Sequence, residues 1–247
     1  AVIIAYNEEK TLPGCIESVR QLADEIWVVD SFSTDNTASV AKAAGANVVQ
    51  HTFVDFVSQK NFACSLPGTD YILNLDADER LDDTLCNSIL QHRQSEFDAD
   101  AYSMNRLTFV ANKPVYTCGW YPDAKIRLWK KGEAQWVGNR VHEHIALNEN
   151  TITLQLPGVI LHYSFADEKE LSKNTMRFAK LAASELQHRS PYNLVAKLLF
   201  SPVWRFTKSY FLKKGFTDGA LGLAICVEQA RETALKYWYA IHLKRNQ

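Results

Sequence analysis

Short apolar runs alternate with stretches of helical periodicity along the first 80 residues. The runs at 1–5, 25–30, 47–50 and 70–75 have the length and composition of strands, and the apolar residues between them recur at helical spacing. Strands that alternate with helices are typical of a parallel sheet whose crossover helices cover its faces. The pattern therefore predicts an α/β fold in this part of the chain.

The pattern changes in the rest of the chain. Residues 98–130 are rich in strand-forming residues, whereas residues 167–188 carry apolar side chains at helical spacing. Ser190 and Ser201 are each followed by Pro, and this pair is typical of a helix N-cap and the first helical position. We therefore predict two further helices that begin there, and a last helix over 221–243.

Carboxylates gather where the fourth predicted strand ends. Residues 71–75 read as a buried strand, and Asp76 and Asp78 follow it directly. In open α/β sheets, ligands bind at the carboxyl edge of the strands. Two aspartates separated by one small residue repel each other and lose hydration. The pair therefore predicts a bound positive group, such as a divalent cation that carries a phosphate.

The same acidic stretch has a purely structural interpretation. Together with Glu79, Asp82 and Asp83, the two aspartates would suit the start of a helix at Thr84, because acidic side chains favour helix N-termini. The residues alone leave both interpretations open.

The first two predicted strands also end in acidic loops, at residues 6–9 and at Asp30. All three acidic ends would lie on one edge of a parallel sheet. The sequence contains neither a Rossmann glycine fingerprint nor a P-loop motif, so a ligand at this edge would be bound through a different motif. Helix capping is predicted for the polar side chains after Asp30, namely Ser33, Thr34, Asp35 and Thr37.

Composition narrows the class of protein. Apolar residues make up 47% and charged residues 22%, and no apolar run approaches the roughly 18 residues of a membrane-spanning helix. The five cysteines are scattered, odd in number and without a CxxC pair, which argues against a disulfide framework or a zinc site. Because the chain opens on a strand rather than a signal peptide, we expect reduced thiols and a cytoplasmic location.

The net charge of −1 hides an asymmetry. Residues 1–166 carry 13 Lys and Arg against 21 Asp and Glu, giving −8, whereas residues 167–247 carry 14 against 7, giving +7. A basic C-terminal third suits an anionic membrane or substrate, and equally a solvated basic surface. Nucleic acid is not expected as a partner, because this part has no recognisable nucleic-acid motif.

A helix in this basic part is predicted to be amphipathic. Lys197, Arg205 and Lys208 fall on one side. The opposite side carries an apolar stripe of Leu199, Val203, Phe206 and Tyr210. Such a helix, flanked by Trp204 and Phe211, suits either a peripheral contact with the inner face of the cytoplasmic membrane or packing against the rest of the protein.

Several short motifs together resemble the family 2 inverting glycosyltransferases of the GT-A fold. They lie at residues 3–9, 28–35, 59–62, 75–79, 119–123, 127–128, 141–143, 162–163 and 213–219. The set is most similar to the bacterial branch that adds glucose or a similar sugar to the inner core of lipopolysaccharide. It implies a mainly parallel GT-A sheet flanked by helices, with a helical C-terminal extension.

The resemblance also implies a domain division and an activity. Residues 1–165 would form the catalytic domain, with a nucleotide-binding half over 1–80 and an acceptor-side half over 98–165, and residues 166–247 would form the helical extension. The implied reaction moves a hexose from a nucleotide-diphospho-sugar, such as a UDP-sugar, to a cell-envelope glycan or lipopolysaccharide-core acceptor. The implied cofactor is Mg²⁺ or Mn²⁺.

Donor-site roles follow from the same resemblance. It implies that Asp30 reads the nucleotide base, that Lys60 lies near the diphosphate, and that Asp76 and Asp78 form the DxD motif. Asp76 would lie nearer the ribose and Asp78 would bind the metal. The loop that holds base and ribose would comprise Ala5, Tyr6 and Glu8.

The catalytic base is predicted to be a carboxylate, because an inverting transfer needs a group that takes the proton of the attacking acceptor hydroxyl. Glu143 is the first candidate and Asp123 the second. The acid–acid dipeptide that is commoner in this region of the family is absent from this sequence. His142 or His162 would complete the metal sphere.

Trp120 and Tyr121 are predicted to contact the acceptor, because aromatic faces suit a sugar ring. Packing of both rings in the core beside Pro122 is the structural alternative. Two rival functions also remain: a nucleotidyltransferase, which holds nucleotides and Mg²⁺ on a similar sheet, and a non-catalytic glycan- or lipid-binding module on the same fold.

Overall fold

The computed structural model describes residues 1–138, 143–186 and 188–245. The chain forms two compact units. The first comprises Ala1–Arg106 and Asp123–Tyr163, and the second comprises Leu107–Pro122 and the chain from Ser164 onward. This division follows packing and assigns residues 107–122 to the second unit. The functional division into a catalytic domain over 1–165 and an extension over 166–247 stays a prediction.

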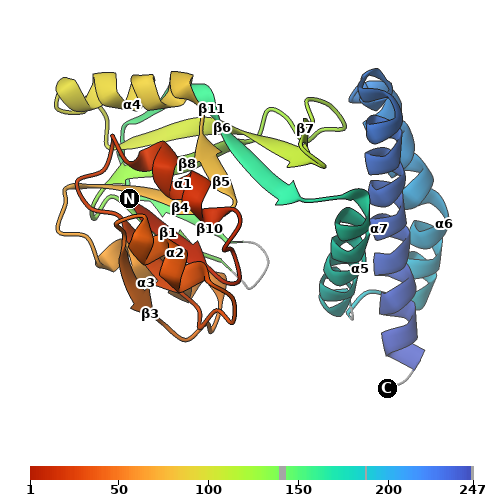
Figure 1. Ribbon diagram of the computed structural model, residues 1–247. Helices are drawn as coiled ribbons and strands as arrows, with labels where there is room; N and C mark the ends of the chain where they lie inside the picture. Colours follow the sequence, from red (N-terminus) through yellow and green to blue (C-terminus); the bar gives the residue numbers. More distant parts are fainter. Residues whose placement is uncertain (139–142, 187, 246–247) are drawn as a thin grey trace. The chain divides into compact units, whose positions relative to one another are not determined.

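Four strands form one half of the central sheet and run parallel, as predicted (Figure 1). Their order in the sheet is β3-β2-β1-β4. The helices that connect them are short. For example, α2 ends at Ala43, and Gly45, two residues later, has a left-handed backbone conformation. The elements are β1 (Val2–Ala5), α1 (Leu12–Val19), β2 (Trp27–Asp30), α2 (Thr37–Ala43), β3 (Asn47–Gln50), α3 (Phe56–Ser65) and β4 (Tyr71–Asp76).

The other half of the sheet is antiparallel, so the sheet as a whole is mixed. β8 pairs antiparallel with β4 and with β6, and β5 pairs antiparallel with β11. β9 and β10 form a separate two-stranded sheet. The elements are β5 (Glu79–Leu81), α4 (Asp83–Gln94), β6 (Ala101–Val110), β7 (Lys113–Pro114), β8 (Ala124–Lys130), β9 (Ala134–Val137), β10 (His144–Leu147) and β11 (Thr153–Phe165).

Alternate residues of the parallel strands supply two cores on opposite faces of the sheet. Ile3 and Leu75 pack with α1, α2 and α4 on one face. Val2, Ile4 and Ile72 pack with α3 and β9 on the other. Because both faces are covered, β1, β2 and β4 are largely buried, which explains why they read as continuous apolar runs, whereas the edge strand β3 is partly exposed.

The second unit is mainly helical. It contains α5 (Glu168–Ser184), α6 (Pro191–Thr207), a π-helical turn η1 (Lys208–Leu212), a 3₁₀ turn η2 (Gly215–Asp218) and α7 (Gly219–Arg245). Both α5 and α6 pack against α7. In the part of the chain that the structure describes, no helix has the length and apolar character needed to cross a membrane.

The predicted helix start at Ser201 is wrong. Ser190 caps α6 through a bond from the Asn193 amide, and α6 then continues through Pro202 to Thr207. A proline inside a helix removes one backbone hydrogen bond and usually kinks or ends the helix. Here packing of α6 along α7 compensates for the missing bond, which no local sequence signal reports.

Gly158 provides a test of how β11 crosses the start of α4. Its φ is +94°, and a Cβ atom there would lie 2.3 Å from the Leu85 amide nitrogen and 2.7 Å from Asp82 Oδ1. We expect Gly158→Ala to lower the free energy of unfolding by about 1–2 kcal/mol for the backbone conformation and about 1–3 kcal/mol more for the clash. Urea denaturation measures the loss.

Gly132→Ala is the matched control. Gly132 has the same φ of +94°, but its Cβ would meet no atom within 4 Å, so only the conformational cost of about 1–2 kcal/mol is expected. Equal losses for the two variants would contradict the proposed clash.

Candidate active site

The register of the sheet brings the three acidic strand ends together. Ala5 lies beside Asp30, and Ile4 lies beside Asp76, so β1, β2 and β4 end next to one another. The prediction that these ends share one sheet edge is therefore confirmed.

Polar side chains after β2 hold the loop after β1. Ser33 Oγ accepts a hydrogen bond of 2.9 Å from the Asn7 amide, and Thr37 Oγ1 accepts one of 2.7 Å from the Glu8 amide. Asp35 accepts from the amides of Glu9 and of Thr37. The predicted helix capping is therefore wrong for Ser33 and Thr37, whose hydroxyls fix one loop against another. Asp35 does accept from the amide of Thr37, the first residue of α2, although the N-cap residue Asn36 makes no side-chain capping bond. The Glu8 carboxylate in turn accepts from the Thr11 hydroxyl.

The rings of Tyr6 and Phe32 extend from these loops into solvent, whereas the carboxylate of Asp30 is buried. Tyr6 is 58% exposed and Phe32 is 52% exposed. Asp30 is fully buried, and its carboxylate accepts from the Ser33 amide at 3.2 Å and from Gln50 Nε2 at 3.3 Å. The Tyr6 ring is therefore open to a planar ligand. A base-reading role for Asp30 stays a prediction.

Lys60 joins two of the predicted site carboxylates. It lies on the buried side of α3, and its Nζ atom is 3.1 Å from Asp76 Oδ1 and 3.6 Å from Glu143 Oε1. The same Nζ atom lies 4.3 Å from the centre of the Trp136 ring, whose face attracts a cation. Asn61 fixes this ring, because its side chain bonds both the amide and the carbonyl of Trp136.

Arg127 brings a second buried cation to the same place from β8. Its Nη2 atom lies 2.9 Å from Asp76 Oδ2 and 2.5 Å from Glu79 Oε1. Burial of the Asp76 carboxyl raises its pKa, but the charges of Lys60 and Arg127 outweigh this effect and hold the pKa well below its usual range. Burial likewise opposes the charge of Arg127, yet the two carboxylates raise its pKa above the ordinary value.

Glu79 is the most deeply buried member of this group. The side chain is fully inaccessible, and its Oε2 atom accepts a 3.0 Å hydrogen bond from the Asp76 amide. A buried carboxylate without cationic partners would be strongly destabilising. Glu79 can therefore fix the turn that follows β4 because Arg127, and at longer range Arg106, neutralise it.

Arg106 connects Asp123 to the same group. Its guanidinium bonds Asp123 Oδ2 through Nε at 3.0 Å and Nη2 at 2.8 Å, and its Nη1 lies 3.4 Å from Glu79 Oε1. Lys125 Nζ lies 2.9 Å from the other oxygen of Asp123. Both oxygens of Asp123 are therefore paired with cations.

Asp78 and His162 form the pair that suits a metal ion. His162 lies on β11, and its Nε2 atom is 3.2 Å from Asp78 Oδ2. Within the described ranges, no three His, Cys, Asp or Glu side chains gather as a ready-made metal site. Mg²⁺ in nucleotide sites is usually held by one or two side chains, and substrate phosphates supply further ligands. The pair fits that arrangement, whereas Asp76 is already neutralised by cations. The predicted ligand His142 lies outside the described residues.

The helix-start interpretation of the acidic stretch applies only to its second part. Asp82 caps α4, since its Oδ1 accepts from the Leu85 amide at 2.8 Å, and Asp83 lies in the first turn. Asp76 and Glu79 instead belong to strands β4 and β5. The helix-start interpretation therefore does not extend to Asp76 and Glu79, and the ligand-binding interpretation of Asp76 and Asp78 stays a prediction.

The predicted acceptor aromatics belong to the second unit. Trp120 is half-buried and packs near Phe165, with ring centres 6.0 Å apart. Tyr121 is partly exposed and meets Tyr116 edge to face. Core packing therefore accounts for part of the Trp120 surface, and the acceptor role of both rings stays a prediction.

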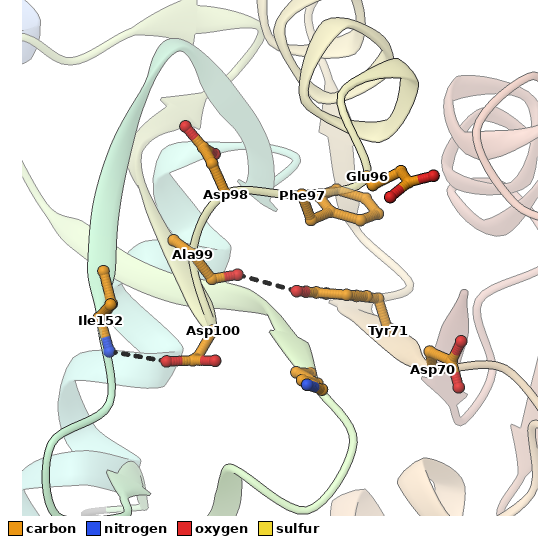
Figure 2. A pocket seen from close by; sticks show the side chains of 9 residues that line it. Asp70, Tyr71, Glu96, Phe97, Asp98, Ala99, Asp100 and Ile152 are labelled. Atoms are coloured by element: carbon orange, nitrogen blue, oxygen red, sulfur yellow. Dashed lines mark hydrogen bonds between the residues drawn. The ribbon is translucent and has the colours of Figure 1, made fainter.

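A pocket of about 410 Å³ lies at the other end of β4 (Figure 2). It is bounded by Tyr71, which begins the strand, and by the acidic loop 96–100. The Tyr71 hydroxyl donates to the Ala99 carbonyl and the Ile152 amide donates to Asp100, as Figure 2 shows. Asp76 ends the same strand, so this pocket is separate from the candidate active site.

Comparison with known proteins places these observations in a family. Residues 1–142 match the family model described as Glycosyl transferase family 2. An uncharacterized glycosyltransferase of Rickettsia conorii is 30% identical over 241 residues, 90% of this chain and 82% of that protein. The lipopolysaccharide core biosynthesis glycosyltransferase LpsC of Rhizobium meliloti is 29% identical over 224 residues, 85% of this chain and 80% of that protein. The solved structure of S. aureus TarS 1–349 has 12% identity and a TM-score of 0.46, covering 99% of this chain and 90% of that chain.

The lowered pKa of Asp76 predicts a pH-dependent contribution to stability. Because the folded pKa lies below the ordinary 3.8, the carboxylate stabilises the fold above about pH 4, and the contribution is lost as the pH falls further. We expect Asp76→Asn to be less stable than the parent at neutral pH, with a difference that shrinks below pH 4. Urea titrations over a pH series measure this.

Glu149→Gln, which changes an exposed carboxylate, serves as the control and is expected to leave the stability near that of the parent at every pH. A parent-to-Asp76→Asn difference that stays constant from neutral to acidic pH would contradict the ion pairing.

Proposed function

Because the chain belongs to glycosyl transferase family 2 and has the GT-A fold, we propose that it transfers a hexose from a nucleotide-diphospho-sugar, with inversion, to a lipopolysaccharide-core acceptor. The observation that carries this proposal is the convergence of Lys60 and Arg127 on Asp76 at the shared strand ends. Such a group of cations suits a ligand that develops negative charge when it leaves.

The buried N–H groups near these cations support a phosphate ligand. Arg127 Nε and Nη1 and Trp136 Nε1 have no hydrogen-bond partner within the part of the chain that the structure describes. A buried donor without a partner costs about 1–3 kcal/mol. Phosphate oxygens would satisfy such donors, whereas an apolar ligand would leave the cost in place.

Asp78 and His162 are the proposed metal ligands. A bound Mg²⁺ or Mn²⁺ would neutralise charge on the diphosphate as the bond to the sugar breaks. Lys60 and Arg127 keep Asp76 ionised next to this position, in the place proposed for the ribose. Tyr6 offers an exposed ring for the base beside Asp30, which favours a UDP-sugar or a similar donor.

Glu143 is the proposed general base. In the reaction, the acceptor hydroxyl oxygen forms a bond to the anomeric carbon, the bond from that carbon to the diphosphate oxygen breaks, and the hydroxyl proton moves to the carboxylate. Among the residues that the structure describes, Glu143 has one long ion-pair contact, of 3.6 Å with Lys60, whereas Asp123 is held on both oxygens by Arg106 and Lys125. The less engaged carboxylate is better placed to accept a proton.

The acceptor class rests on the relative from Rhizobium meliloti, which is named for lipopolysaccharide core biosynthesis. With this acceptor class we also propose a location in the cytoplasm, on the inner side of the cytoplasmic membrane. Trp120 and Tyr121 are the proposed acceptor contacts.

A direct test measures the products formed from nucleotide-diphospho-hexoses with Mn²⁺ and a lipopolysaccharide-core acceptor. The parent is expected to release nucleoside diphosphate in step with sugar transfer. Glu143→Gln keeps the shape of the side chain but removes its basicity, so kcat should fall by about 10²- to 10⁴-fold while the Kd for donor stays unchanged. Asp123→Asn should cost much less.

The outcomes separate the rival functions. Pyrophosphate as the product would indicate a nucleotidyltransferase, and donor binding without turnover by the parent would indicate a binding module. An active Glu143→Gln together with an inactive Asp123→Asn would reassign the base. Glu149→Gln, on the same segment of chain, is the matched control and should retain full activity.

A further inference from the structure

One side of α6 and η1 exposes large apolar side chains. Tyr192 is 89% exposed, Phe200 is 74% exposed and Trp204 is 61% exposed. Four more side chains on the same segment are more than half exposed. We call these residues the α6 outer surface; they are Tyr192, Leu199, Phe200, Val203, Trp204, Phe211 and Leu212.

This exposure corrects the predicted apolar stripe. Phe206 and Tyr210 are partly buried and pack in the core of the second unit, as expected for a packing face. Leu199 and Val203, in contrast, are 64% and 66% exposed. The side of α6 that is buried against its neighbours instead includes Leu194, which packs with residues of α5 and α7. The α6 outer surface is therefore additional to the helix packing of this unit.

The charge around the surface has one sign. Between Glu185 and Asp218 the sequence contains no acidic residue. The same stretch contains six exposed cationic side chains, which are Arg189, Lys197, Arg205, Lys208, Lys213 and Lys214. Arg205 also has an anionic neighbour outside this stretch, Glu232 on α7. A segment that carries six cations and no anion of its own beside aromatic and aliphatic side chains is typical of one that lies on an anionic membrane.

The observations favour a lipid surface over other partners. A second copy of the chain would bring six cations against six cations, which costs free energy unless anions intervene. A nucleic acid would pair with the cations but would leave the aliphatic side chains Leu199 and Val203 without an apolar partner. An anionic bilayer satisfies both, because its phosphates pair with the cations and its acyl chains accept the apolar groups.

We propose that the α6 outer surface binds an anionic membrane, with its aromatic and aliphatic side chains below the headgroups and its cations among the lipid phosphates. The proposal depends on the exposure and charge of α6 and η1 and not on the proposed transferase reaction. Aromatic rings are suited to this depth, since they are amphipathic and prefer the interface.

Vesicle sedimentation with the full chain tests the proposal. The parent should pellet with vesicles of phosphatidylcholine and phosphatidylglycerol and ignore vesicles of phosphatidylcholine alone. Phe200→Ser with Trp204→Ser removes the apolar contribution, and Lys197→Glu with Lys208→Glu reverses two charges. Each double variant should lower the partition coefficient between vesicles and solution by at least about tenfold. The reason is that the contribution of two cations, or of two buried rings, to membrane binding is at least that large. Only the charge contribution should weaken as salt rises.

The matched control is Lys169→Glu with Lys173→Glu on α5, which makes the same charge change at two exposed positions outside the surface. It should bind as the parent does. Melting followed by circular dichroism should be unchanged in all variants, since the altered side chains are exposed. Quenching by brominated lipid should decrease when Trp204 alone is changed to Phe.

Three results would overturn the proposal. In the first, the parent fails to bind anionic vesicles. In the second, the variant with Phe200→Ser and Trp204→Ser binds as tightly as the parent, which would reduce the contact to charge alone. In the third, the parent does not bind vesicles, and sedimentation equilibrium shows that it is a dimer. If the variant with Phe200→Ser and Trp204→Ser is then a monomer, a second copy of the chain covers the surface. Donor hydrolysis in solution should be equal in all variants, so loss of vesicle binding remains distinguishable from failure of the transferase proposal.

Discussion

Two buried carboxylates, Asp76 and Glu79, stay ionised at the end of β4 because two buried cations neutralise them. Removing one partner of such a pair costs about 3–5 kcal/mol, so the group is stable only when complete. Its members come from α3, β4, β5 and β8, which lie far apart in the sequence. The order of the sheet follows the same requirement, because β8 must lie beside β4 for Arg127 to reach Asp76.

The same ion pairs divide the acidic cluster into residues with different chemistry. Both oxygens of Asp76 contact cations, whereas Asp78, in the turn between β4 and β5, lies next to the imidazole of His162. Glu143, on a different segment, contacts Lys60. The same lysine therefore contacts both Asp76, in the proposed donor site, and the proposed base. Charge that develops on a departing diphosphate would meet cations already fixed in place, which is the arrangement that lowers a barrier without reorganisation.

Much of this could be predicted from local patterns. Apolar runs identified the parallel strands, and the acids after β1, β2 and β4 identified the edge, because strand ends in a parallel sheet coincide. The buried partners could not be predicted in this way. Arg127 lies within an apolar strand and Arg106 in another, and only their pairing with Glu79 shows why. An arginine inside such a strand is itself a signal, since a buried charge requires a partner. Pro202 and the exposed Leu199 depend on tertiary packing, which periodicity does not report.

We propose that this strand edge binds a nucleotide-diphospho-sugar through a metal held by Asp78. Thermal unfolding with a panel of nucleotide-sugars, with and without Mn²⁺, tests it most directly. At saturating donor, the parent should gain roughly 5 °C in Tm only when Mn²⁺ is present, while Asp78→Asn should unfold at the parent's temperature without ligand and gain nothing with it. A metal-independent shift, or a full shift in Asp78→Asn, would contradict the account.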